Sequence, residues 1–419
     1  MADKNMQMAH RIAQKVAEHG GRTFFVGGFV RDRLMGKENK DIDIEIHGIM
    51  PEVLESILNG LGKMTEMGAS FGIFGLKGYE LDIAMPRKEE ATGRGHKDFT
   101  VFVDPFLGTY KAALRRDFTM NALMQDVLTD EVVDHFGGIA DMNKGVLRHV
   151  NSDTFVEDPL RVLRAAQFAA RFGFEVAPET IALAKTMDLT ALARERILGE
   201  LEKALLKADT PSVFFAEMVK MEQMKDWFPE LEQLSEEIWK YTMKVLDTAV
   251  SYRKQVEEPL QFMLLALTHA LPDGKVRKTF LERVTNENKV IKYVENMAPL
   301  YQEPKKLFLE QVEEVETTTL FDKALKPHEL VLFSVLVDCV EHEQKKNGEL
   351  EKFLQERLAV FERVMAKPFV MGADLIKQGM KPGKSFSKIL AYAHKLRLAE
   401  VDKQEALAQT MLYAKEQNL

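Results

Sequence analysis

The sequence predicts an α/β domain at the N-terminus that is followed by an all-helical remainder. Two observations carry this prediction. Residues 1 to about 150 are rich in glycine and alternate short β-branched runs with stretches of helical period. After about residue 150, strand patterns nearly vanish and apolar residues recur at helical spacing up to the C-terminus. We therefore expect a small mixed sheet with helices first, and helices alone beyond it.

Local patterns predict the elements of the first domain. Strands are expected at Thr23–Val26, Asp41–Ile46, Gly72–Leu76, Tyr79–Ala84, Thr100–Val103 and Val132–Asp134. Helices are expected over residues 6–19, 27–35, 51–59 and 117–124. A polar loop with two glycines over 86–98 joins two of the strands, and a loop of this length inside a compact domain is often functional. The helical remainder is divided into residues 151–210 and 211–419.

Length and composition bound the class of protein. With 419 residues the chain is too long for one simple core, and 46% hydrophobic with 29% charged residues is typical of a well-folded protein. The single cysteine, Cys339, excludes an intrachain disulfide and a cysteine-based zinc site. No apolar stretch approaches about 18 residues, and the amphipathic N-terminus lacks the apolar centre of a signal peptide. We therefore expect a cytoplasmic protein with no membrane partner.

The densest motif joins a glycine turn to a pair of carboxylates. Gly27 and Gly28 follow the first expected strand and open a helix, an arrangement in which backbone N–H groups can cradle a phosphate. Asp41 and Asp43 lie on the next strand, and their spacing of two places both on one face. A lone Asp-x-Asp pair is usually a solvated strand edge. Beside a phosphate cradle it indicates nucleotidyl transfer with Mg²⁺ as the cation.

Two further carboxylates lie near this pair. Asp82 interrupts an apolar strand pattern, so it could act as a base or as a third metal ligand, or it could pair with Arg87 at the strand end. The sequence leaves both roles of Asp82 open. Glu45 shares the strand face of Asp41 and Asp43 but lies further along, which favours a structural role.

An arginine pair precedes the helix expected at 117–124. Arg115 and Arg116 come directly before Asp117, which is expected to cap that helix, with Asn121 one turn further on. An arginine at this place could clamp triphosphate oxygens with its fork of donors. A plain surface pair is the alternative.

A second arginine-rich motif opens the helical part. Pro159 suits the first position of a helix, so Asp158, Arg161 and Arg164 would lie at i, i+3 and i+6 on one face. The common outcome there is an i,i+3 ion pair. An Asp–Arg pair could also match the edge of cytosine or adenine, because the carboxylate accepts from the base amino group and the guanidinium donates to ring acceptors. Uracil and guanine would then be rejected.

A basic run lies near the C-terminus. Residues 377–397 contain six lysines and arginines and no acidic residue, although the net charge of −8 argues against indiscriminate binding of nucleic acid. Its candidate RNA-binding residues are Lys377, Lys381, Lys384 and Lys388. A solvated helix face is the alternative reading of the same charges.

Taken together, the motifs resemble the class II tRNA nucleotidyltransferases (CCA-adding enzymes) and the similar bacterial poly(A) polymerases. The resemblance rests on VGGFVRD, DIDIEI, LDIAMPR, RRDFTMNAL, DHFGGIADM and EDPLRVLRAAQFAARFGF, and more weakly on ALARERILGELEKAL and GADLIKQGMKPGKSFSKIL. It implies a nucleotidyltransferase head over 1–150, a helical neck over 151–210 that selects the nucleotide, and a body and tail over 211–419 that bind tRNA.

The resemblance also implies a reaction and roles for single residues. The reaction is Mg²⁺-dependent addition of CCA to the 3′ end of tRNA from CTP and ATP, with release of pyrophosphate. An A-adding enzyme, a poly(A) polymerase and a catalytically silent RNA-binding module remain alternatives. The implied roles are nucleotide contacts by Gly27, Gly28 and Arg31, Mg²⁺ binding by Asp41 and Asp43, a triphosphate contact by Arg115, and selection of C then A by Asp158 and Arg161 with Arg164 nearby.

This chain departs from the family pattern at two places. The family often has another arginine one turn after Arg164, where this chain has Gln167. Many relatives also carry a metal phosphohydrolase module with a His-Asp dyad, but here Ala270 follows His269. We therefore expect His269 to be packed inside a helix, and we expect no phosphohydrolase activity.

Overall fold

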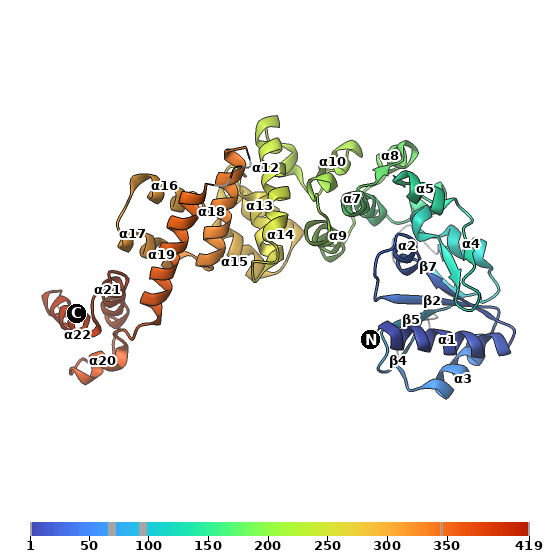
Figure 1. Ribbon diagram of the computed structural model, residues 1–419, viewed down its shortest axis with the longest axis horizontal. Coiled ribbons are helices and arrows are strands. Elements are labelled where there is room, and N and C mark those ends of the chain that lie inside the picture. The colour runs from blue at the N-terminus through green and yellow to red at the C-terminus, as the bar shows by residue number, and fades with distance from the viewer. Residues whose placement is uncertain (1, 66–72, 92–98, 344, 346, 418–419) are drawn as a thin grey trace. The chain divides into compact units, whose positions relative to one another are not determined.

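The computed structural model describes residues 2–65, 73–91, 99–343, 345 and 347–417 (Figure 1). It forms two compact units, the first made of Met1–Ala204 with Val213–Asp226 and the second of Leu205–Ser212 with Trp227–Leu419. Within the described part of the chain, no helix is both long enough and apolar enough to cross a membrane.

A mixed sheet of seven strands forms the centre of the first unit, in the order β3-β4-β5-β2-β1-β8-β9. The strands β2 and β5 run parallel, and the other neighbours run antiparallel. The strands are β1 (Arg22–Val26), β2 (Ile42–His47), β3 (Met64–Thr65), β4 (Ile73–Leu76), β5 (Leu81–Ala84), β8 (Met124–Asp126) and β9 (Val132–Val133).

The two faces of this sheet differ in chemistry. Along β2, Ile42, Ile44 and Ile46 are buried in one apolar core with residues of α1 (Ala2–Glu18), α2 (Gly28–Leu34) and α3 (Pro51–Leu61). Figure 1 shows α1 and α3 lying against the sheet. Because successive residues of a strand point to opposite faces, Asp43 and Glu45 point away from this core. Strand β2 therefore has an apolar face turned to the helices and an acidic face turned away from them, beside the apolar Phe24 and Val26 of β1.

Smaller elements complete the first unit. A two-stranded antiparallel sheet is formed by β6 (Arg87–Ala91) and β7 (Phe99–Val103), and a parallel pair by β10 (Val146–Leu147) and β11 (Glu175–Val176). The helices are α4 (Thr109–Leu114), the 3₁₀ helix η2 (Thr119–Asn121), α5 (Gly138–Lys144), α6 (Ser152–Phe155), α7 (Leu160–Phe172), α8 (Pro178–Ala184), α9 (Arg194–Lys207) and α10 (Ser212–Lys220).

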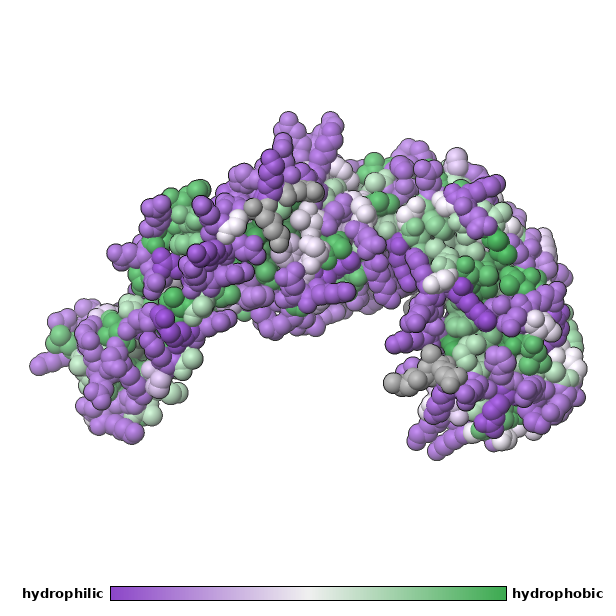
Figure 2. All heavy atoms as spheres, in the orientation of Figure 1, coloured by the Kyte–Doolittle hydropathy of each residue, from purple (hydrophilic) through white to green (hydrophobic). Residues whose placement is uncertain are grey.

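The second unit is helical throughout its described residues. Its helices are α11 (Pro229–Glu232), α12 (Glu236–Ala249), η3 (Val250–Tyr252), α13 (Pro259–Thr268), α14 (Gly274–Val284), α15 (Asn288–Met297), α16 (Glu303–Glu310), α17 (Glu314–Lys323), α18 (Pro327–Glu341), α19 (Gly348–Ala366), α20 (Gly372–Lys377), α21 (Phe386–Leu398) and α22 (Lys403–Glu416). Polar side chains cover much of the visible surface of these helices in Figure 2, as expected where each helix buries one apolar face. The last three helices have a small core of their own.

The predicted fold class is confirmed, and two local predictions are wrong. The expected helix over 117–124 is instead the short helix η2 followed by strand β8, because Phe118 is extended (φ −125°, ψ 151°) and the Asp117 carboxylate accepts from Asn121 Nδ2 rather than capping a helix. The expected loop 86–98 begins with strand β6, and residues 92–98 lie outside the described residues. The strand expected at 100–103 forms, but it pairs with β6 rather than with the main sheet.

Candidate nucleotide and metal site

Three carboxylates line one pocket at the acidic face of β2. Asp43 on β2 lies directly beside Asp82 on β5, because these parallel strands pair in register at this point. Asp41 precedes β2, and all three residues line one pocket of about 460 Å³. Burial and the neighbouring Asp82 carboxylate raise the pKa of Asp43 to about 6, and Arg116 opposes the rise. The structure thus brings the three predicted acidic residues together.

This set of carboxylates fits a hard divalent cation. Carboxylate oxygens are the ligands that Mg²⁺ prefers, and a cation would relieve the repulsion between Asp43 and Asp82. Among the residues that the structure describes, no three His, Cys, Asp or Glu side chains converge closely enough to hold a metal on their own. Mg²⁺ usually keeps several coordination positions for water and substrate phosphates, so an incomplete protein site is compatible with this ion.

The glycine turn lies next to these carboxylates. Gly27 has a φ of 66°, in the left-handed region that favours glycine. A Cβ atom at Gly27 would lie 3.2 Å from Arg116 Nη1 and 3.9 Å from Asp43 Oδ2, and one at Gly28 would lie 3.4 Å from Arg31 Nη2. Two guanidinium groups therefore flank the turn. Guanidinium groups match phosphate oxygens with paired donors, so this turn is suited to a triphosphate.

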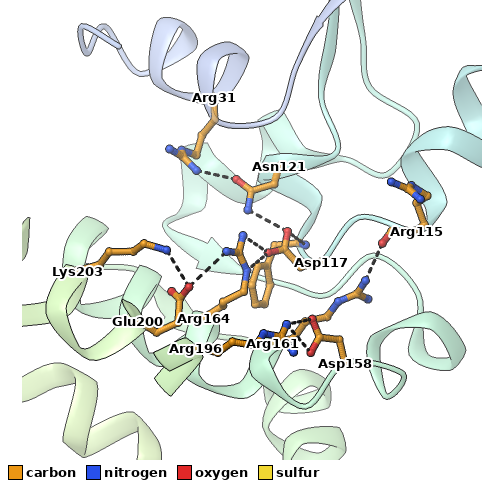
Figure 3. Close-up of polar contacts among 11 residues, drawn as sticks. Arg31, Arg115, Asp117, Asn121, Asp158, Arg161, Arg164, Arg196, Glu200 and Lys203 are labelled. Atoms are coloured by element: carbon orange, nitrogen blue, oxygen red, sulfur yellow. Dashed lines mark hydrogen bonds and ion pairs between the residues drawn. The ribbon is translucent and has the colours of Figure 1, made fainter. Parts of the chain in front are cut away.

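The structure distinguishes the two adjacent arginines. Arg116 is the one that approaches the glycine turn, and its Nη2 forms an ion pair with Glu45 Oε2 at 3.6 Å. Arg115 offers its backbone carbonyl to Arg161 Nη2 at 2.8 Å (Figure 3). The sequence pattern left the two arginines undistinguished, and the resemblance selected Arg115, because two neighbouring arginines in one motif carry no local signal that tells them apart. A triphosphate contact by Arg115 stays a prediction.

A chain of hydrogen bonds links α2 to α7 (Figure 3). Arg31 Nη1 donates to Asn121 Oδ1 at 2.7 Å, and Asn121 Nδ2 donates to Asp117 Oδ1 at 3.0 Å. The other Asp117 oxygen accepts from Arg164 Nε at 2.7 Å. Burial by itself would raise the pKa of Asp117, but the Arg164 guanidinium and the bond from Asn121 hold it below its usual value. Asp117 therefore stays ionised between the glycine turn and the start of the neck.

Arg164 is fixed on a second side by α9. Its Nη1 lies 3.7 Å from Glu200 Oε1, and the same oxygen accepts from Lys203 Nζ at 2.8 Å. The Arg164 pKa is raised by the neighbouring Asp117 and Glu200 carboxylates, although burial by itself would lower it. Sequence reasoning found Arg164 and not Glu200, since the contact joins residues far apart in the chain.

The start of α7 gathers the other residues of the second motif. Asp158 Oδ1 accepts from Leu160 N at 3.1 Å, as expected of a residue that begins a helix. Both Asp158 oxygens accept from Arg196 Nη2 of α9, at 3.1 and 2.9 Å, so the partner of this carboxylate is Arg196 rather than Arg161. Arg161 Nη1 instead donates to the carbonyl of Thr154 at 2.7 Å. Sequence reasoning missed Arg196, which lies 38 residues from Asp158.

Comparison with a known family identifies the segment that carries this geometry. Residues 23–148 match the family model of the poly(A) polymerase head domain. This segment is therefore similar in sequence to that head domain. Residues 23–148, called the head domain below, contain the glycine turn, the three carboxylates and the arginine pair, so these motifs lie within one matched segment.

Curated relatives extend beyond the head domain. The chain is 36% identical over 288 residues to the multifunctional CCA protein of Ralstonia nicotianae, covering 64% of this chain and 65% of that protein. It is 37% identical over 241 residues to the CCA-adding enzyme of Actinobacillus succinogenes, covering 56% of this chain and 58% of the relative. The matched region thus spans somewhat less than two thirds of the length of these relatives.

Solved structures share the fold over nearly the whole chain. A CCA-adding enzyme in complex with ATP superposes with a TM-score of 0.73 at 23% identity, covering 99% of this chain and 94% of that one. The Thermotoga maritima CCA-adding enzyme in complex with tRNA-CCA gives 0.68 at 22% identity, covering 97% and 95%. At these identities the likeness establishes the fold, which includes the helices that follow the head domain.

One histidine of the second unit, His269, is packed, as expected. His269 follows α13, is 4% exposed and lies among the rings of Tyr241, Tyr301 and Phe333, with ring centres 5.4 to 5.6 Å away. Its Nδ1–H donates to the carbonyl of Ala266 at 2.9 Å. Burial lowers the pKa of His269 to about 4. The expected lack of phosphohydrolase activity stays a prediction.

The basic run lies in and between α20 and α21. Its four candidate residues, Lys377, Lys381, Lys384 and Lys388, are all exposed. In the parts of the chain that the structure covers, these four lysines form no ion pair with an acidic side chain, in contrast to Lys403, which pairs with Asp374 at 3.0 Å. Their charges are therefore available to a ligand.

Proposed function

We propose that this protein is a template-independent nucleotidyltransferase that adds CCA to the 3′ end of tRNA from CTP and ATP. The observation that carries the proposal is the glycine turn at Gly27, which has Arg116 on one side and the Asp43 carboxylate within reach. A place for phosphate oxygens thus adjoins a place for a divalent cation. The names of the curated relatives support the same activity.

In the proposed reaction, the 3′-hydroxyl of tRNA attacks the α-phosphorus of the nucleotide. A phosphodiester bond forms, and the bond to pyrophosphate breaks. Arg31 and Arg116 hold the triphosphate and stabilise the negative charge that collects on the departing pyrophosphate. Asp41 and Asp43 would hold Mg²⁺, which supplies a lower pKa for the attacking hydroxyl and charge neutralisation at the phosphates when it is bound. Asp82 would act beside Asp43 as a base or as a further ligand.

Selection between nucleotides falls to the start of the neck. We assign it to Asp158 and Arg161, with Arg164 nearby. Arg196 supports this role for Asp158, because its contacts hold the carboxylate in place as an acceptor that the amino group of cytosine or adenine can approach. A base with a carbonyl at that position would bring two acceptors together, which is unfavourable.

Binding of tRNA is assigned to the helical body and tail. The four exposed lysines near α20 and α21 would contact phosphates of the tRNA, and such contacts supply affinity without base specificity. The substrates and the predicted absence of a membrane partner are consistent with a cytoplasmic protein.

One incorporation experiment tests the proposal. Three tRNAs that end before the CCA sequence, after its first C and after its second C are each offered CTP, ATP or both, with Mg²⁺. Extension of all three to a complete CCA end is the expected result. Extension of the last tRNA alone would assign A-addition, and long runs of A on varied RNAs would assign a poly(A) polymerase, which the family of the head domain favours as the second candidate. If the protein extends none of these RNAs, the remaining alternative is a catalytically silent RNA-binding module.

A further inference from the structure

The acidic face of β2 continues beyond the residues used so far. Glu45 follows Asp43 at a spacing of two, so both point to the same face of the sheet. Glu45 is 5% exposed and His47 is 7% exposed. A carboxylate buried to this extent is costly unless it is paired, so the partners of Glu45 indicate its role.

Each oxygen of the Glu45 carboxylate faces a different basic side chain. Oε1 accepts from His47 Nε2 at 2.9 Å, and Oε2 lies 3.6 Å from Arg116 Nη2. The His47 ring meets Phe24 edge to face at 5.3 Å, and Phe24 lies opposite Glu45 in the β1–β2 ladder. His47 packs against Phe24 and donates to Glu45, and these two contacts fix the orientation of the Glu45 carboxylate. Its second oxygen then faces Arg116.

Arg116 connects this carboxylate to the glycine turn. While Nη2 faces Glu45, Nη1 lies 3.2 Å from the position that a Cβ atom would take at Gly27. The Arg116 side chain is 29% exposed, against 6% for Glu45, so the arginine is the accessible member of the pair. The same Gly27 position lies 3.9 Å from Asp43 Oδ2, so Arg116 has a second carboxylate close by.

We propose that Glu45 is a positioning residue that holds the Arg116 guanidinium at the Gly27 turn, ready for the phosphates of CTP or ATP. The inference rests on the proposed function, because it names what fixes one of its phosphate-binding groups. A long arginine side chain otherwise loses rotamer freedom when it binds a ligand, which weakens affinity. An arginine released from Glu45 could also turn to Asp43 and compete with the cation there.

Binding of CTP without tRNA tests the proposal in the full chain. Glu45→Gln keeps the shape of the side chain and removes its charge. We expect calorimetry to show CTP binding about tenfold weaker, because a hydrogen-bonded charge is lost at the group that orients the arginine. In turnover, kcat/KM for CTP should fall by at least the same factor, with part of the loss in kcat, because Arg116 also faces the charge on the departing pyrophosphate. Glu131→Gln is the matched control, since it removes an exposed partner of Arg22 on the same sheet (Oε2 to Nη2, 3.3 Å).

A second pair of variants separates positioning from general support of the fold. If Glu45 acts through Arg116, the double variant E45Q/R116Q should bind CTP no more weakly than Arg116→Gln alone. The proposal would be overturned if the fold-losses in CTP affinity of the two single variants multiply in the double variant. It would also be overturned if Glu45→Gln binds CTP as tightly as the unmodified protein. Should Glu45→Gln fail to fold, Glu45→Asp draws the charge back from Arg116, and unchanged CTP binding by that variant would also overturn it. Failure of the unmodified protein to bind CTP and ATP would instead refute the proposed function.

Discussion

Asp43 in the head domain and His269 in the helical unit both have strongly shifted pKa values, but their surroundings differ. Burial and the Asp82 carboxylate raise the pKa of Asp43 to about 6, and its pocket also contains Asp41. The pKa of His269 is lowered to about 4 chiefly by burial, among three aromatic rings. Asp43 thus lies beside other carboxylates, whereas His269 lies among aromatic rings, with Arg277 a smaller cause of its shift.

The difference teaches how a shifted pKa should be interpreted. Burial in an aromatic cluster is an ordinary result of packing, and it accounts for His269. A second carboxylate beside Asp43 adds repulsion that packing does not require, and the residues line an open pocket. A shifted pKa therefore indicates a functional site where a like charge lies beside the group in a pocket, and indicates a core where burial is the chief cause, as it is for His269.

Replacing the central carboxylate should have the largest effect. Asp43→Asn should lower nucleotide incorporation by at least about a thousandfold, because it removes a ligand for the cation that stabilises charge in the transition state. Asp41→Ala should have the same result. In buffer without divalent ions the melting temperature of Asp43→Asn should not fall, since the substitution removes repulsion from Asp82. Radiolabelled incorporation and thermal melting measure the two quantities.

Turnover by Asp43→Asn close to that of the unmodified protein would contradict the metal assignment. A loss of activity together with a lower melting temperature would mean that Asp43 supports the fold, and the contrast with His269 would disappear. Glu131→Gln, which alters an exposed carboxylate of the same sheet region, should change neither quantity.

His269 tests the other side of the comparison through pH. In the unfolded chain His269 has a pKa near 6.5 and is protonated below that pH. In the folded chain its pKa is about 4, so it stays neutral until the pH falls to about 4. The contribution of neutral His269 is therefore intact above pH 6.5 and is lost as the pH falls toward 4, by about 3 kcal/mol in all. In His269→Phe the fall in unfolding free energy between pH 7 and pH 4.5 should be smaller by roughly 2 kcal/mol.

Denaturant titrations at the two pH values measure this difference, and incorporation at neutral pH should be unaffected by the substitution. An equal loss of stability in both proteins would mean that His269 takes up its proton in the folded state. A large loss of activity at neutral pH would show that His269 is not merely a packed residue.

The sequence predicted the parts of the site that depend on local spacing. The turn at Gly27 and Gly28 and the one-sided placement of Asp41 and Asp43 follow from chain order and the alternation of a strand. The juxtaposition of Asp43 and Asp82 does not, because it requires β2 and β5 to pair in parallel and in this register. Strand pairing depends on contacts between distant parts of the chain, which a local sequence pattern does not predict.

The remaining failures have the same cause. A helix was expected at 117–124 because Asp117 resembles a cap, but the buried Asp117 carboxylate is bound by Asn121 and Arg164. Tertiary contacts overrode a local preference there. Arg196 was missed because its partner, Asp158, is distant in the chain.

Asp158 extends the comparison with Asp43. Asp43 lies beside a second carboxylate, whereas the charge of Asp158 is balanced within the protein by Arg196. Asp158→Ala should raise incorporation of UMP relative to CMP by about tenfold, because the acceptor for the base amino group is lost. Arg196→Ala should produce a smaller change in the same direction. Competition assays with UTP and CTP on a tRNA that lacks CCA measure the ratio. Unchanged selectivity in Asp158→Ala would remove it from nucleotide selection, and the exposed neighbour Asp153, changed to alanine, should leave the ratio as it is.

The smallest effects are expected in the tail, where charges face solvent without an acidic partner. Lys381→Ala and Lys384→Ala should each weaken tRNA binding a few-fold at physiological salt and lower the slope of log K against log salt by about one, as expected when one phosphate contact is lost. Lys240→Ala is the control, because Lys240 already pairs with Glu236 on α12 at 2.5 Å. If the slope is the same in all three variants, the basic run is only a solvated helix surface. A slope that falls with each tail lysine, while incorporation at saturating tRNA stays constant, would instead show that charge serves affinity in the tail and chemistry in the head domain.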